Sequence, residues 1–547
     1  AGALAFRRRR VTASLSSLSF APARVVTGVL PVRRTAARAA SACQDHTVRY
    51  RETKEQNMGS GFLRSNGRAR LLPLQSAKRP AMNRRSLLHL GLTGALTSAA
   101  PALLPAVARA QGGQIHDAAD FGAVGDGQTI NTRPIQAAID AAAAEGGGTV
   151  VIRPGLYLSG SLFVKSGVTL MIGRGATIRG LKDIAAYPMI RTRVAGIEMD
   201  WPAALLNIYR QQNAKITGEG LVDGDGQVFW DSYWALRRDY DPRDLRWAAD
   251  YDCRRPRLIH LYEADQAEVS GLNLARSGFW TVHVCYSRDV TVSDLIIRNN
   301  IGGRGPSTDG VDIDSSERVL VERCDIAVND DALCIKAGRD WDGLRVARPC
   351  RQVRVKDCVV RDALAGMTFG SETSGGFEDI EVSGLRIEYP VPLGIFFKSG
   401  HTRGGVISNI RLRDIHLQDV RTLFRVNLNW YPNYSYARIP PGVADVPDYW
   451  RALATPVPRD RGVPRIHDVR LSDIKAAGGK VGFEAAAYPE APLKDFLFER
   501  LDWDVHDAGT IANAQGWRFV DCNIDTLDGK APRVTDSARV TGLSDRA

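Results

Sequence analysis

A short pattern of apolar residues recurs from residue 269 onward and constrains the fold more than any other feature of the chain. Each copy has an apolar residue, two intervening residues, a second apolar residue, one further residue and a final apolar residue. Most copies begin 21 to 34 residues after the previous one, and one interval of 59 residues fits two turns with a long insertion between Asn427 and Pro464. The copies are Val269-Leu272-Leu274, Val292-Leu295-Ile297, Val321-Cys324-Ile326, Val355-Cys358-Val360, Val382-Leu385-Ile387, Leu412-Ile415-Leu417, Leu471-Ile474-Ala476, Phe498-Leu501-Trp503 and Phe519-Cys522-Ile524.

This repeat predicts a right-handed parallel β-helix. A strand alternates its two faces, and one copy has too little apolar surface to fold alone. Stacked copies bury one continuous core, with neighbouring strands about 4.8 Å apart. The irregular intervals indicate constant strands joined by variable turns. An α-solenoid would need a period of about 3.6 residues, and a propeller would need several antiparallel strands in each blade of about 40 residues.

The N-terminal part of the repeat region predicts a capping helix. Residues 131–140 have an amphipathic pattern with Thr132 near the N-cap and Pro134 in the first turn, and Gly146-Gly147-Gly148 ends the helix. Two segments with strand character follow, Thr149–Ile152 and Val168–Ile178. A helix in this place covers the open end of the stack, as the exposed terminus of a solenoid requires.

Residues 82–110 have the features of an export signal. Paired arginines, Arg84 and Arg85, precede an apolar run through Leu104 and a small-x-small motif that ends at Ala110. This order is typical of a signal peptide, and the arginine pair resembles a twin-arginine signal. We therefore expect an exported protein, either periplasmic or extracellular.

The alternative interpretation of this apolar run is a membrane anchor. Pro101 and Pro105 interrupt the run, which is short for a transmembrane helix, so we expect no stable membrane insertion after cleavage. We interpret residues 1–81 as a non-structural upstream extension. Residues 111–547 are then a single β-helix catalytic domain.

The basic charge of the chain is concentrated in its first 110 residues. The whole chain has 72 Lys and Arg against 61 Asp and Glu, and residues 1–110 contain 19 and 3 of these. The rest has 53 basic and 58 acidic side chains, a net charge of −5. The high isoelectric point therefore does not indicate a nucleic-acid partner.

The cysteines do not form a disulfide framework. Seven of the eight lie after residue 110, an odd number, and none forms a metal-type CxxC pair. Cys324, Cys358 and Cys522 occupy the repeat position that Leu or Ile fills in other copies. We expect these three side chains to pack in the core.

Two aspartate motifs carry the strongest functional signal. Asp309 precedes the pair Asp330-Asp331 by 21 and 22 residues, about one turn of the repeat, so stacking would place the three carboxylates side by side. Glycoside hydrolysis needs one protonated carboxyl group and one ionised carboxylate, and mutual repulsion can create that asymmetry. For Asp312 and Asp314, the alternative is that they are ordinary turn residues.

At these motifs the chain resembles glycoside hydrolase family 28, the polygalacturonases and related pectinases. The likeness extends from about Asp117 to Cys522. It implies inverting hydrolysis of galacturonosyl linkages, with Asp330 as general acid and with Asp309 and Asp331 positioning and deprotonating the water. The matching segments are Phe121–Gly127, Gly224-Asp225-Gly226 with Trp230, Arg255–Ile259, Ser307-Thr308-Asp309 and Asp330-Asp331.

Two departures mark the chain as an atypical member. Where the family usually has Gly-His-Gly, this chain has Leu364-Ala365-Gly366, and the family's Arg-Ile-Lys reads Phe396-Phe397-Lys398. The usual histidine and arginine are therefore absent. Lys398 remains to hold a uronate carboxylate, and His401 and Arg403 are candidates to replace the lost groups.

These departures favour an exo-acting polygalacturonase-like enzyme or a rhamnogalacturonan galacturonohydrolase. The segments Trp230–Arg257 and Asn427–Pro464 are rich in aromatic residues and arginine. Such segments can bind sugar rings and close one end of a cleft, or they can simply pack onto the β-helix.

Two further interpretations remain open. A pectate lyase-like enzyme would use a Ca²⁺ site and leave an unsaturated product, and a glycan-binding β-helix would have no catalysis. We expect a monomeric hydrolase without cofactor or resident metal, acting on pectic polysaccharide or oligogalacturonide.

Overall fold

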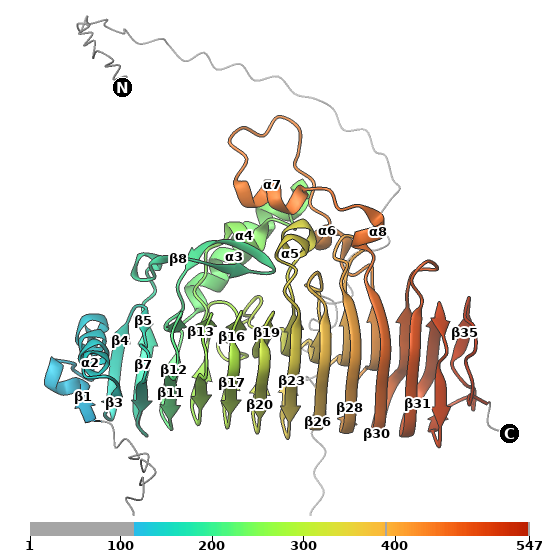
Figure 1. Ribbon diagram of the computed structural model, residues 1–547, viewed down its shortest axis with the longest axis horizontal. Coiled ribbons are helices and arrows are strands. Elements are labelled where there is room, and N and C mark those ends of the chain that lie inside the picture. Colours follow the sequence, from blue (N-terminus) through green and yellow to red (C-terminus); the bar gives the residue numbers. More distant parts are fainter. Residues whose placement is uncertain (1–113, 389–390, 545–547) are drawn as a thin grey trace, which may run out of the picture. The chain divides into compact units, whose positions relative to one another are not determined.

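The computed structural model describes residues 114–388 and 391–544, which form a right-handed parallel β-helix (Figure 1). This confirms the predicted fold class. The described residues lie in one compact unit. The predicted extension at residues 1–81 and the predicted signal peptide at residues 82–110 lie outside the described residues. Within the described ranges, no helix is long and apolar enough to cross a bilayer.

The coils build three parallel sheets. The first sheet contains β5 (Leu162–Phe163), β10 (Leu206–Tyr209), β13 (Ile259–Tyr262), β16 (Val282–Cys285), β19 (Val311–Asp314), β22 (Asp331–Lys336), β25 (Ala365–Phe369), β27 (Leu393–Lys398) and β29 (Thr422–Asn427). The second contains β1 (Gln114–Asp117), β3 (Gly148–Ile152), β6 (Val168–Ile172), β11 (Lys215–Gly218), β14 (Glu268–Ser270), β17 (Arg288–Ser293), β20 (Glu317–Glu322) and β23 (Cys350–Lys356). The third contains β2 (Asp126–Ile130), β4 (Gly155–Ser159), β7 (Ala176–Gly180), β12 (Leu221–Asp223), β15 (Asn273–Ala275), β18 (Ile296–Arg298), β21 (Asp325–Ala327) and β24 (Val359–Asp362).

In the C-terminal coils single long strands run through more than one sheet. These strands are β26 (Phe377–Ile387), β28 (Val406–Gln418), β30 (Arg465–Ala486) and β31 (Leu493–Ala512). Strands β26 and β28 run through the second and third sheets, and β30 and β31 also continue the first. The last coil has β32 (Ala514–Gln515), β33 (Arg518–Val520), β34 (Asn523–Thr526) and β35 (Arg533–Thr535).

Each copy of the sequence repeat contains a bend between the second and third sheets. The residue just before the second apolar position has a positive φ in every copy, which turns the chain while both flanking apolar side chains stay inside. Glycine and aspartate suit this conformation better than most residues do. The bend residues are Gly271, Asp294, Arg323, Asp357, Gly384, Asp414, Asp473, Arg500 and Asp521.

The predicted capping helix is α2 (Thr132–Ala144), and its buried side chains include Ile135 and Ile139. The strand prediction for Val168–Ile178 was too simple. The segment divides into β6 in the second sheet and β7 in the third. Gly175, with a φ of 80°, turns the chain between them.

One continuous apolar core fills the β-helix. Cys324 and Cys358 are buried in it, as predicted, whereas Cys522 is only half-buried at the C-terminal end of the stack. All seven cysteines in the described residues are free thiols.

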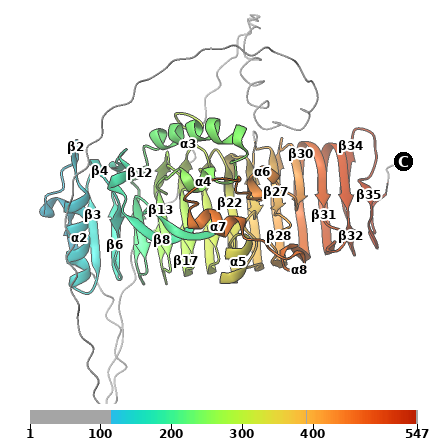
Figure 2. The same cartoon turned by 90° about the horizontal axis from the view of Figure 1, so that it is seen from above.

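Inserted elements gather over one side of the β-helix (Figures 1 and 2). They form a second apolar cluster that includes Trp201, Trp247 and Trp450. Short 3₁₀ turns also occur at Ala118–Phe121, Ile184–Ala186 and Asp241–Arg243. The inserted elements are the antiparallel hairpin β8 (Met189–Val194) and β9 (Ile197–Pro202), and the helices α3 (Gln227–Tyr240), α4 (Ala249–Asp252), α5 (Asp340–Val346), α6 (Pro432–Ser435), α7 (Asp448–Ala454) and α8 (Arg459–Gly462).

Candidate active site

The three aspartates meet on adjacent strands of the first sheet. Asp309 lies two residues before β19, and Asp330 and Asp331 lie at the start of β22. The amide of Gly310 donates to the Asp331 carbonyl at 2.9 Å, which places the two motifs side by side. One carboxylate oxygen from each aspartate lies within 4.8 Å of the others. Stacking therefore brings together groups that are about one coil apart in sequence.

The three carboxyl groups have different environments. Asp309 and Asp331 are buried, and Asp330 is half-buried. Burial and the charge of Asp331 raise the pKa of Asp330 to about 6, even though Lys398 acts in the opposite direction. Burial, followed by repulsion from Asp312 and Asp330, raises the pKa of Asp309 well above its usual value. The cluster can therefore hold a proton near neutral pH.

Lys398, at the end of β27, forms an ion pair with Asp331. Its Nζ lies 2.6 Å from Asp331 Oδ2 and 4.5 Å from the centre of the Trp430 ring. Burial acts to lower the pKa of Lys398, but Asp331, Cys334 and Asp330 together outweigh that effect and hold the pKa above its ordinary value. The ammonium group thus links one carboxylate of the cluster to an aromatic face.

A second buried lysine, Lys336, lies at the other end of β22. Its Nζ is 3.7 Å from Asp309, 3.5 Å from Asp312 and 3.3 Å from Glu372. It also lies 4.7 Å from the centre of the Trp280 ring. Lys336 is therefore a cation shared by Asp309 and by two further carboxylates, Asp312 and Glu372.

Two of the carboxyl groups around Lys336, Asp312 and Glu372, have pKa values shifted in opposite directions. Burial raises the pKa of Asp312 to about 7, against the attraction of Lys336. Burial also acts to raise the pKa of Glu372, but Lys336, Arg403 and Arg339 lower it to about 2. Glu372 is thus a permanent anion beside a carboxyl group that titrates near neutral pH.

No sequence motif gives a role to Lys336 or Glu372, and the sequence leaves Asp312 as either a site residue or a turn residue. The sequence signal for these three residues is their position on or next to neighbouring strands. Asp312 and Lys336 occupy outward positions on β19 and β22, the strands that carry the two aspartate motifs, and Glu372 follows β25 on the next coil. These strand positions place the side chains near the aspartates, but their ion pairs form only in the folded stack.

Asp314 is a buried anchor and not a turn residue. It ends β19, and its Oδ1 accepts from Arg193 Nη1 at 2.8 Å while His283 Nε2 lies 3.6 Å from Oδ2. All three side chains have no exposed surface. Because Arg193 belongs to β8, this ion pair fixes the inserted hairpin on the first sheet.

His401 and Arg403 follow β27 but have different surroundings. The His401 ring is partly exposed and stacks on Tyr436 at 4.1 Å. The Arg403 guanidinium is fully buried, donates to the Ser371 carbonyl at 2.6 Å and lies 3.5 Å from Glu372. Of these two candidates, His401 has the surface that a direct substrate contact requires.

Three groups in the described ranges have donor atoms close enough for a metal ion, and a protein cation lies beside each. The cations are Lys398 at Asp331, Lys336 at Asp312 and Arg193 at Asp314. Repulsion from these cations disfavours a divalent ion at each group. The groups are Asp309-Asp330-Asp331, Asp309-Asp312-Cys334 and His283-Cys285-Asp314.

The family model for glycosyl hydrolases family 28 matches residues 173–439, which carry all of these side chains. Over these residues the chain is similar to glycosyl hydrolases family 28. A second model, described as rhamnogalacturonase A/epimerase, pectate lyase-like, matches residues 115–220.

Individual relatives have related names. A probable polygalacturonase from Vitis vinifera is 30% identical over 57% of this chain and 62% of its own length. An exo-poly-alpha-D-galacturonosidase from Dickeya chrysanthemi is 24% identical over 58% of this chain and 59% of its own length. The chain thus spans about three fifths of these curated relatives. The solved structure of a hyperthermoactive exopolygalacturonase from Thermotoga maritima has 26% identity and a TM-score of 0.60, and the match covers 73% of this chain and 87% of that one.

The two expected departures from the family-28 pattern fall at Ala365 and Phe396. Ala365 begins β25 and pairs in register with Asp331, so the position is adjacent to the aspartates but has no side-chain donor. Phe396, at the position of the family's arginine, pairs in register with Arg425 on β29. The Arg425 guanidinium lies 5.6 Å from the Phe396 ring and pairs with Glu484 at 3.2 Å. An arginine is therefore present one coil further along.

Proposed function

We propose that this chain is a glycoside hydrolase that cleaves galacturonosyl linkages in pectin, acting from a chain end. The observation that carries the proposal is the aspartate cluster, in which a half-buried carboxyl group with a raised pKa lies beside a carboxylate paired with a lysine. General acid–base hydrolysis needs this division between a proton donor and a proton acceptor.

In the proposed reaction, Asp330 gives its proton to the glycosidic oxygen as the bond to the anomeric carbon breaks. A water molecule attacks that carbon and loses a proton to the carboxylates of Asp309 and Asp331. Asp309 Oδ1 is buried and accepts no hydrogen bond from the described residues, so its capacity to accept a proton is not used by the protein. Asp330 then regains a proton from solvent, and the acidic pair releases one.

The stereochemistry needs its own measurement. Similarity to the family implies inversion, yet carboxyl groups in inverting enzymes are usually about 6.5–9.5 Å apart. The closest oxygens here lie within 4.8 Å. We propose inversion because Asp331, paired with Lys398, leaves an ionised carboxylate beside Asp330 to help activate water. Proton NMR of the first product should show the β-anomer from an α-linked substrate, and an α-anomer would instead assign a covalent, retaining reaction.

For substrate recognition we propose Lys398, His401 and the aromatic face of Trp430. Lys398 has three N–H donors and uses one on Asp331, which leaves capacity for a uronate carboxylate. Arg403 was predicted to bind substrate as well. Its buried contacts with Ser371 and Glu372 favour an indirect effect, through the position of Glu372.

Exo action is supported by the inserted elements beside the first sheet. Helices α5 and α7 and strand β9 contact one another, and α3 and α4 pack together. These packed elements would block one end of the site, so that a polymer could not extend past it and cleavage would occur near a chain end. Two of the named relatives are also exo-acting enzymes.

We further propose that the protein is exported and acts as a monomer. Pectic polymers are outside the cell that secretes such an enzyme, and residues 82–110 have the pattern of a signal peptide. Mass spectrometry of the secreted protein should give an N-terminus at or near Gln111.

The test of the function is product analysis with Asp330→Asn beside a matched control. The parent should release monogalacturonate from homogalacturonan oligosaccharides, and Asp330→Asn should lose at least about 100-fold in kcat. Asp357→Asn makes the same change at an exposed bend and should keep full activity. Equal turnover by the parent and Asp330→Asn would refute the assignment.

The second candidate is a rhamnogalacturonan galacturonohydrolase, favoured by the rhamnogalacturonase-type match over residues 115–220. Digestion of rhamnogalacturonan oligosaccharides in parallel decides between the two substrates. A product that absorbs in the ultraviolet, with activity lost on chelation, would indicate a lyase. Binding without any product would indicate a glycan-binding β-helix.

A further inference from the structure

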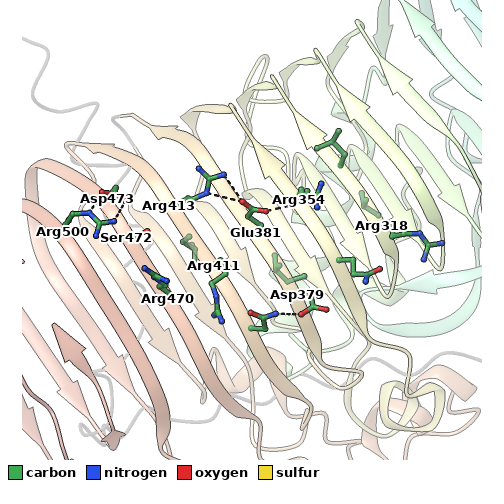
Figure 3. A pocket seen from close by; sticks show the side chains of 16 residues that line it. Arg318, Arg354, Asp379, Glu381, Arg411, Arg413, Arg470, Ser472, Asp473 and Arg500 are labelled. Carbon is green, nitrogen blue, oxygen red and sulfur yellow. Dashed lines mark hydrogen bonds and ion pairs between the residues drawn. The ribbon is translucent and has the colours of Figure 1, made fainter. Parts of the chain in front are cut away.

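A groove of about 1010 Å³ lies on the second sheet, away from the aspartate cluster. Its walls come from β20, β23, β26, β28, β30 and β31, and none of the candidate catalytic residues lines it. Figure 3 shows its charged side chains arranged along successive strands. Three carboxylates and six arginines line the groove, and the arginines are Arg318, Arg354, Arg411, Arg413, Arg470 and Arg500.

The strand register arranges part of this charge in a row. Arg354, Glu381, Arg411 and Arg470 are direct neighbours on four consecutive strands. Neighbouring strands lie about 4.8 Å apart, so the row presents closely spaced cations across the coils. A linear polyanion laid along the row could contact several of them at once.

Two of the arginines are not fully neutralised by the protein. Arg354 and Arg413 share one carboxylate, Glu381, at 3.9 Å and 3.0 Å. Their side chains are 75% and 57% exposed. Each of the other four groove arginines has a carboxylate partner of its own, and the pairs are Arg318 with Asp289, Arg411 with Asp468, Arg470 with Glu499 and Arg500 with Asp473. The positive charge available to a ligand is thus concentrated around Glu381.

We propose that this groove binds the uronate chain of a pectic polymer at a site separate from the catalytic one. The choice of ligand depends on the proposed function. Residues 111–547 carry a net charge of −5, so an anionic polymer is repelled by the protein as a whole and needs a local surplus of arginine to bind. A guanidinium fork also matches a carboxylate in shape. Binding here would hold the polymer while its chain ends are processed.

The test uses the whole exported chain with Asp330→Asn, which keeps the probe intact. Affinity for polygalacturonate is measured by calorimetry, with and without Arg354→Gln and Arg413→Gln. We expect the double variant to bind the polymer about tenfold more weakly at low salt, and the difference should shrink as salt is added. The charge-matched control is Arg288→Gln with Arg361→Gln, two exposed arginines outside the groove, and it should bind like its parent.

In the active enzyme, the groove variant should raise KM for long polygalacturonate and leave kcat and KM for trigalacturonate unchanged. Equal polymer affinity for the groove and control variants overturns the proposal and assigns the arginines to cross-strand stability. If the active parent cleaves no galacturonan, but its polymer binding still depends on the groove, the proposed function fails while the groove remains a polyuronate site.

Discussion

Asp330 and Asp331 are neighbours in sequence but have different chemical environments. Asp331 begins β22 and pairs with Lys398, whereas Asp330 is half-buried beside that pair. A buried carboxyl group is harder to ionise, and a second carboxylate nearby makes ionisation harder still. The start of β22 thus supplies both the donor and one of the acceptors of the proposed reaction.

This difference predicts the pH dependence of turnover. In the proposed reaction Asp330 acts as the protonated acid, and its pKa is raised to about 6 by burial and Asp331. We therefore expect kcat/KM on a short oligogalacturonide to fall as the pH rises above about 6, approaching a tenfold loss per pH unit. The substrate carboxylates stay ionised in this range, so the loss reports the enzyme. A rate that is constant from pH 5 to pH 8 would contradict the role of Asp330.

A buried ion pair in the same sheet predicts a large stability effect. Arg193→Met leaves Asp314 buried without its cation, so we expect a loss of about 3–5 kcal/mol in the free energy of unfolding by urea at pH 7. Arg193 holds the pKa of Asp314 below its usual value, although burial opposes this. The contribution is therefore present above the unfolded pKa of about 3.9 and disappears as the pH falls below it.

The matched control for this change is Arg174→Met. Arg174 is 85% exposed and pairs with Glu219 at the surface, so its loss should cost less than about 1 kcal/mol. The gap between the two variants should be smaller at pH 3 than at pH 7. A similar loss in the free energy of unfolding for both variants would show that the buried Arg193 pair stabilises the fold no more than a surface pair does.

At the scale of elements, the repeat predicted the strands well because apolar spacing decides which residues face the core. Val269 and Leu274, for example, are both buried as expected. The bends were not predicted, because a positive φ at Arg323 or Arg500 is imposed by its neighbours in the stack and has no glycine to signal it. The aspartates could be aligned from the repeat spacing. Lys336 and Glu372 could not be assigned, because their roles depend on three-dimensional contacts across coils.

The proposed cleavage at chain ends depends on the packing of the inserted helices. Trp450 of α7 donates to Asp252 at 3.1 Å, and Tyr449 donates to the same carboxylate at 2.6 Å. Trp450→Ala removes the ring that packs on Trp247 and should loosen α7. We expect cleavage within the polymer to increase, so that viscosity falls more for each reducing end released. An exposed residue on the same helix, Arg451, provides the control through Arg451→Ala.

The whole molecule behaves as a stack in which each coil contacts mainly its neighbours. Stability in such an array is approximately a sum of coil and interface contributions, so damage at one end stays near that end. The aspartate cluster lies in the middle of the described coils, and α2 covers the first ones. We therefore expect that damage to the cap lowers the stability of the first coils without changing turnover.

Ile139→Asp tests this expectation. Ile139 is fully buried in α2, and an unpaired charge there should detach the cap from the first coils. Hydrogen exchange should then lose protection in β1, β3 and β6, while β19 and β22 stay protected and kcat at low temperature stays within about twofold of the parent. Asp140→Ala, on the exposed side of the same helix, should change neither. Loss of protection in β19 together with β1 would instead show that the stack unfolds as one cooperative unit, in which the cap stabilises the active site directly.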